Sequence, residues 1–121
     1  MRYQKVIKLD TYSCEVVINI SDDIINEAKK IYKRLDQPFV FEGAAEGLVI
    51  NLNIDKYYLL IDAHYLTHNT IAHEIYHVVV RVTEDRDIVD EESQAWLAGL
   101  ITEKMYKFIS LKNLEVGHEA K

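Results

Sequence analysis

The chain has 121 residues, a formal net charge of −6, 49% hydrophobic and 28% charged residues. This length suits one domain with its own core, and the composition excludes a disordered, collagen-like or linker-dominated chain. The acidic balance argues against binding to a phosphate backbone, so we expect no nucleic-acid partner. We find no apolar run of bilayer length and no signal-peptide pattern, and we therefore expect a cytoplasmic protein with no membrane partner.

The N-terminal third predicts a strand pair followed by a helix. Residues Tyr3–Leu9 alternate loosely and Cys14–Ile20 are rich in β-branched side chains, with a turn expected near Asp10–Ser13. The segment Ser21-Asp22-Asp23 then offers helix N-caps, and apolar residues at helical spacing continue to Leu35.

The rest of the chain predicts further strands and two longer helices. We expect a short strand at Phe39–Phe41 and a hairpin formed by Leu48–Leu52 and Tyr57–Ile61. Helices are expected over Asn69–Thr83 and from Asp90 to about Ile109. This order of elements predicts a single α+β domain covering residues 1–121, with a small sheet, an N-terminal helix and two C-terminal helices.

The residues with the most chemical content form an H-E-x-x-H motif, His73-Glu74-Ile75-Tyr76-His77, inside the first of those two helices. Residues four apart lie on one helix face, so both imidazoles can reach one zinc ion. Glu74 lies about 100° around the helix from His73 and is placed to act as general base on a water bound to the metal. The histidines face away from the apolar stripe of the same helix, which consists of Ile71, Ile75, Val78, Val79 and Val82.

A catalytic zinc site needs a third protein ligand, and the start of the last helix supplies two candidates. Glu92 shares its helix face with the small residues Ala95 and Gly99, which would allow close approach to the histidine helix. Glu91 has a comparable ridge of small residues and stays an alternative, and either glutamate could instead complement the helix dipole behind an Asp90 N-cap. Histidines outside the motif are further candidates: His64, His68 and His118.

These residues resemble a known group of enzymes. His73-Glu74-x-x-His77 followed by Glu92-x-x-Ala95 is similar to the gluzincin class of zinc metallopeptidases, and Ile71–Ile101 most resembles ImmA/IrrE-type metallopeptidases, which phages, mobile elements and their hosts encode. The resemblance favours Glu92 as the third ligand. It also implies a minimal zincin-like fold in which Tyr57–Ile61, the strand before the active helix, docks an extended substrate by edge pairing.

The sequence thus predicts a zinc-dependent metallopeptidase. His73, His77 and Glu92 would bind Zn²⁺, Glu74 would be the catalytic base, and the substrate would be a protein or peptide, in the host cytoplasm if the chain is phage-encoded. Two alternatives stay open: a zincin-fold structural or interaction module, for example a phage component with little or no catalysis, and a metal-dependent hydrolase of something other than a peptide.

Overall fold

The computed structural model of the protein describes residues 1–40 and 45–117. Across these residues it has an α+β architecture, with three α-helices and one mixed sheet of four strands. The α+β prediction is therefore confirmed. The elements in chain order are β1 (Arg2–Leu9), β2 (Cys14–Ser21), α1 (Ile24–Arg34), β3 (Gly47–Ile50), β4 (Lys56–Asp62), α2 (His68–Glu84) and α3 (Glu91–Leu111), with short 3-10 helices at Asp10–Tyr12 and Ala63–Tyr65.

The sheet has the strand order β1-β2-β4-β3. Its two outer pairs are antiparallel, β1 with β2 and β3 with β4, and the second pair is the hairpin expected from the sequence. The central pair, β2 with β4, is parallel, with Ile18 opposite Leu59. A parallel pair needs a crossover connection, and the chain between β2 and β4 contains α1 and β3.

This topology corrects one expectation about substrate docking. Tyr57–Ile61 was expected to offer a free edge, but β4 is paired on both sides, to β2 and to β3. Its backbone groups are therefore already used within the sheet, and it has no free edge. Among the described residues the outer strand on this side is β3, Gly47–Ile50.

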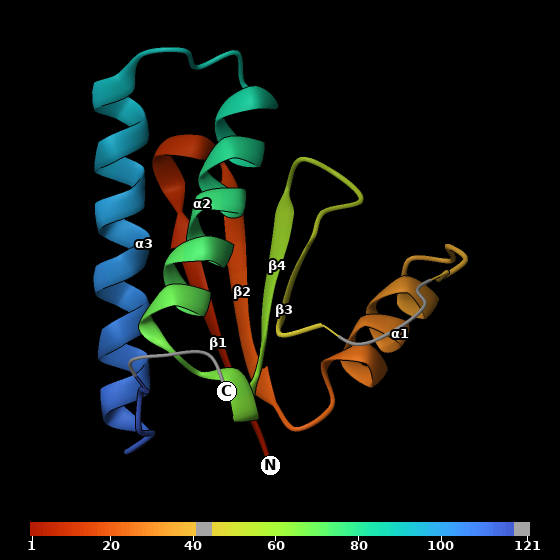
Figure 1. Cartoon of the computed structure of the whole chain (residues 1–121). Helices are drawn as coiled ribbons and strands as arrows, with labels where there is room; N and C mark the ends of the chain where they lie inside the picture. The colour runs from red at the N-terminus through yellow and green to blue at the C-terminus, as the bar shows by residue number, and fades with distance from the viewer. Residues whose placement is uncertain (41–44, 118–121) are drawn as a thin grey trace.

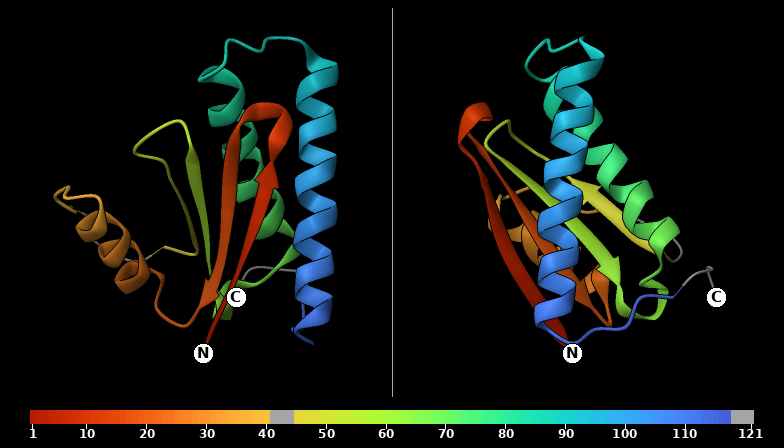
Figure 2. Two further views of the ribbon diagram at one scale, coloured as in Figure 1. Left: turned by 180° about the vertical axis from the view of Figure 1, so that it is seen from behind. Right: turned by 90° about the vertical axis from the view of Figure 1, so that its left-hand side faces the viewer.

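Helices cover both faces of the sheet (Figures 1 and 2). Helices α2 and α3 pack side by side on one face, and α1 lies on the other. The side chains of β2 alternate accordingly, with Val16, Ile18 and Ile20 buried toward α2 and α3. A smaller core under α1 contains Ile24, Ala28, Ile31, Ile50 and Leu60.

Each α-helix begins at a capping side chain. Asp23 accepts a hydrogen bond from the Asn26 amide of α1 at 3.0 Å, and Thr67 accepts one from the Thr70 amide of α2 at 3.1 Å. Asp90 accepts from the Ser93 amide at 2.9 Å, which makes it the N-cap of α3. These bonds satisfy amide groups that have no partner within the helix, and they fix where each helix starts.

One expectation from the sequence differs in the structure. Phe39 and Val40 lie in irregular chain rather than in a strand, because Phe39 packs edge-on against Tyr32 at the end of α1; Phe41 lies outside the described residues.

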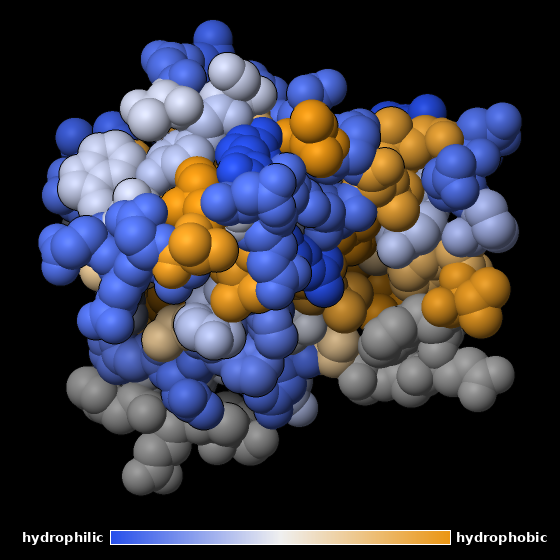
Figure 3. Space-filling view, turned by 90° about the horizontal axis from the view of Figure 1, so that it is seen from above, coloured by the Kyte–Doolittle hydropathy of each residue, from blue (hydrophilic) through white to orange (hydrophobic). Residues whose placement is uncertain are grey.

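Apolar side chains are exposed among hydrophilic ones at the end of the molecule that carries the α2–α3 connection, where Val89 is 89% exposed (Figure 3). In the described ranges, none of the helices has both the length and the apolarity needed to span a bilayer.

Candidate metal and catalytic site

The two histidines of the motif point their imidazoles at each other from adjacent turns of α2. Their Nε2 atoms are 3.1 Å apart and the rings are nearly perpendicular. Two nitrogens that bind one tetrahedral zinc at ~2.0–2.1 Å lie about 3.3 Å apart, so the pair fits a shared cation. The side chain of His73 is 63% exposed, which leaves the pair open to solvent.

Glu74 is a buried carboxylate beside this pair. It is only 5% exposed, and its Oε2 lies 3.7 Å from Nε2 of His73. The described residues provide no hydrogen-bond donor to it. Burial raises the pKa of Glu74, the charges of His73 and Arg81 counter this, and Glu46 adds to the increase. A desolvated carboxylate with unused lone pairs is suited to accept a proton from a water molecule.

The electrostatics also favour the neutral form of the second histidine. The pKa of His77 is lowered by burial, and further by the nearby charges of His73 and Arg81. Neutral imidazole is the form that binds a metal ion, because its ring nitrogen then has a free lone pair. His77 is therefore held in the state required of a ligand over a wider pH range than a free histidine.

The edge strand β3 forms a wall beside Glu74. Gly47 lies so close that a methyl group in place of its hydrogen would be 2.6 Å from Cγ of Glu74. Further along the strand, Nη1 of Arg81 donates to the Val49 carbonyl at 2.6 Å and to Oδ1 of Asn51 at 3.0 Å. Arg81 follows His77 by one helical turn, so α2 contributes both the reactive groups and the contact that fixes the wall.

The two candidate glutamates of α3 are placed differently. Both side chains are exposed, but Glu91 lines a groove of about 410 Å³ between α2 and α3, together with Tyr76 and Val80, whereas Glu92 does not line it. Neither is grouped with His73 and His77: in residues 1–40 and 45–117, no three His, Cys, Asp or Glu side chains are arranged to hold a metal ion.

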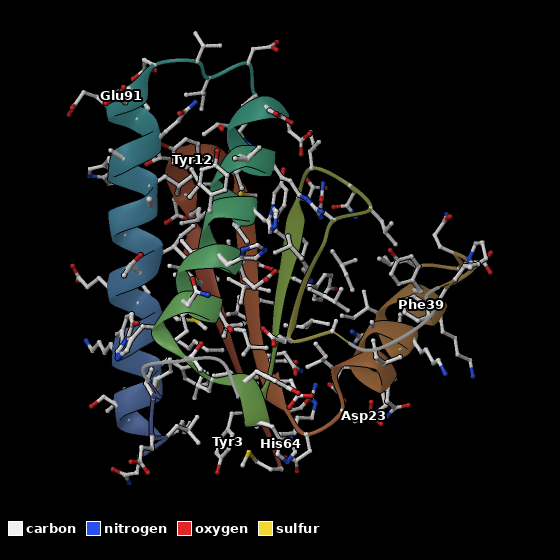
Figure 4. All side chains as sticks on the ribbon, viewed as in Figure 1. Tyr3, Tyr12, Asp23, Phe39, His64 and Glu91 are labelled. Atoms are coloured by element: carbon white, nitrogen blue, oxygen red, sulfur yellow. The ribbon has the colours of Figure 1, made fainter. Side chains whose placement is uncertain are left out.

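The register of the two helices explains this separation. Nδ1 of His68 lies 2.7 Å from the Tyr106 hydroxyl, which aligns the lower ends of the antiparallel pair. At 1.5 Å per residue, His77 is roughly 13 Å from that level and Glu92 roughly 21 Å. Figure 4 accordingly shows Glu91 at the far end of α3, beside the α2–α3 connection, and His64 at the opposite end of α2. The histidine pair fits zinc, whereas the third position is not formed in this arrangement.

The remaining histidines are engaged elsewhere or lie outside the described residues. His64 pairs with Asp62 at 2.9 Å. His68 stacks on Tyr106, and its position on the helix wheel is about 140° from that of His73. His118 falls outside the described ranges.

Some residues at the site were not expected from the sequence. The closeness of Gly47 to Glu74 and the bond from Arg81 to Val49 depend on how β3 packs on α2, and the spacing of Arg81 four residues after His77 was the one available signal. Two tyrosines near the site differ in their surroundings: Tyr76 is exposed next to His77, with ring centres 6.4 Å apart. Tyr57 is instead fully buried, and its hydroxyl is hydrogen-bonded to Asp85 and Arg86. Burial, the main cause, and the hydrogen bond to Asp85 raise the pKa of Tyr57 to about 12.

Comparison of the chain with protein-family models, with curated proteins and with solved structures found no match.

Proposed function

We propose that the protein is a zinc-dependent metallopeptidase, as the gluzincin-like motif implies. The observation that carries the proposal is the convergence of two imidazole Nε2 atoms, 3.1 Å apart, beside a buried carboxylate to which residues 1–40 and 45–117 supply no hydrogen-bond donor. A structural metal site has no need of a buried base at that position. A histidine pair on an ordinary solvated surface would not have one either.

Each residue of the site would have its own role in the reaction. His73 and His77 would hold the metal ion, which when bound supplies a Lewis acid that polarises the scissile carbonyl. Glu74 would take a proton from the attacking water and pass it to the departing amine, since its carboxylate lies next to the histidine pair and has free lone pairs. Tyr76, whose ring lies beside that of His77, would donate a hydrogen bond to the developing oxyanion.

Two parts of the proposal remain: the third metal ligand and the strand that pairs with the substrate. The family pattern favours Glu92, and Glu91 stays the alternative. Glu91 lines the groove between α2 and α3, but neither His73 nor His77 lines that groove, so it does not decide between the two glutamates. For the substrate, β3 replaces β4 as the strand that pairs with an extended peptide, since β4 has no free edge. We expect a protein or peptide substrate in the cytoplasm, and no nucleic-acid partner.

Turnover of a peptide library, with and without a chelator, tests the proposal. Hydrolysis that stops with the chelator, returns with added zinc and is absent in Glu74→Gln supports a metallopeptidase. Zinc bound without hydrolysis of any peptide would favour the non-catalytic module. Hydrolysis that the chelator leaves unchanged would refute a zinc mechanism.

A further inference from the structure

Gly47 of the edge strand and Glu74 of α2 are packed without space for a side chain between them. A Cβ atom at residue 47 would lie 2.6 Å from Cγ, 2.8 Å from Cδ and 2.9 Å from Oε2 of Glu74. Such distances are shorter than real Cβ contacts allow. The backbone dihedrals of Gly47 are in a region open to any L-residue, so the contact with Glu74 is what requires glycine there.

We propose that Gly47 is a positioning residue: the bare backbone of β3 holds the Glu74 carboxylate against the histidine pair. The inference rests on the proposed function, because it assigns Gly47 a part in the same reaction. It adds a residue that the H-E-x-x-H motif does not contain.

Hydrogen bonds hold β3 on both sides, so moving it away from Glu74 would break them. On one side, the Asp62 amide donates to the Glu46 carbonyl at 2.9 Å, which starts the β3–β4 ladder. Because hydrogen-bonded and non-hydrogen-bonded pairs alternate along an antiparallel ladder, the backbone groups of Gly47 and Val49 point to the outer edge. At that edge, Arg81 of α2 donates a hydrogen bond to the Val49 carbonyl at 2.6 Å, so α2 itself holds β3 in place.

The glutamate has equally little freedom. The clash would reach Cγ and Cδ as well as the terminal oxygen, so turning the carboxylate alone would not relieve it. Glu74 would have to rotate about its first side-chain bond, which takes the carboxylate away from Nε2 of His73, now 3.7 Å distant. A methyl group at residue 47 therefore displaces either the proposed base or the strand that Arg81 holds.

The test compares Gly47→Ala with Gly99→Ala, because Gly99 lies on an open face of α3 with no atom within 4 Å of an added Cβ. Gly47→Ala should lower kcat at least ~10-fold with KM and zinc content unchanged, since misplacing a reacting group by about 1 Å can cost as much as 100-fold. Gly99→Ala should keep kcat and raise the melting temperature, as expected for an exposed helical glycine.

A double-mutant cycle on thermal unfolding isolates the contact without reference to activity. Gly47→Ala should lower the melting temperature in the wild type, but not in a Glu74→Ala background, where the clashing side chain is gone. Equal losses in both backgrounds, or an unchanged kcat in Gly47→Ala, would overturn the proposal. If the wild type hydrolyses no peptide, the proposed function fails, and the thermal cycle still decides whether Gly47 and Glu74 are coupled.

Discussion

Replacing Glu74 by glutamine should stabilise the metal-free protein while abolishing its activity. Glu74 is 5% exposed and receives no hydrogen bond from the described residues, although its oxygens are not among the fully buried atoms without a partner, so the folded state carries part of the cost of desolvating the charge. Glutamine keeps the shape and removes the charge, and we expect a gain of about 1–2 kcal/mol. For 121 residues this corresponds to a rise of roughly 4–8 °C in melting temperature.

The pH dependence of that gain identifies its cause. Burial raises the folded-state pKa of Glu74 above its unfolded value, so the folded protein binds this proton more tightly. The gain in unfolding free energy of Glu74→Gln over the wild type should therefore be complete above the folded-state pKa of Glu74. It should shrink as the pH falls toward the unfolded-state pKa near ~4.3. Differential scanning calorimetry across this range, with the exposed Glu103→Gln as control, measures it. A variant less stable than the wild type at neutral pH, or a gain independent of pH, would refute the reasoning.

Three further predictions concern the third ligand, the acid stability and the activity. Glu92→Gln should weaken zinc binding about 10-fold and Glu91→Gln by much less, because the gluzincin-like pattern gives Glu92 as the third ligand. Titration against a competing chelator measures both; the reverse order would move the ligand to Glu91, and equal, negligible losses would mean that neither glutamate binds the metal. Glu27→Gln should cost about 1–2 kcal/mol at neutral pH, because this carboxylate accepts from Arg2 at 2.7 Å and Asn19 at 2.9 Å. Burial raises the pKa of Glu27, but the hydrogen bonds from Arg2, Asn19 and Lys30 outweigh it and lower that pKa. The stability that Glu27 contributes is therefore present above its unfolded pKa near ~4.3 and is lost as the pH falls through its folded pKa. An undiminished difference in unfolding free energy at pH 2 would contradict this assignment. Glu74→Gln should reduce peptide turnover by ~10²–10⁴-fold with zinc content retained, and wild-type turnover would exclude Glu74 as the base.

Local patterns in the sequence predicted the elements well. The β-branched run Cys14–Ile20 became β2, the H-E-x-x-H helix begins within one residue of the expected start, and Asp90 is the N-cap of α3. These features depend on residues close together in the chain, where hydrophobic period and capping chemistry are decisive. The short range Phe39–Phe41 was not a strand in its described part, since a few apolar residues also suit a loop that packs on a helix end.

Features that depend on long-range pairing could not be predicted. The parallel pairing of β2 with β4 moves Tyr57–Ile61 from the edge of the sheet to its interior, and nothing in either strand specifies that partner. The wall beside Glu74 has the same origin, because Gly47 and Arg81 are 34 residues apart and meet only when β3 packs on α2. The histidine pair was predictable because helix geometry alone brings residues four apart together.

Elemental analysis of the purified protein, repeated on His73→Ala and His77→Ala, tests the central claim most directly. We predict about one zinc ion per wild-type chain and a small fraction of that in either variant, because both Nε2 atoms are needed to hold the ion. The variants should stay folded, since the histidines lie on the solvent side of α2, away from its buried valines. Wild-type zinc content in either variant, with unchanged circular dichroism, would contradict the account.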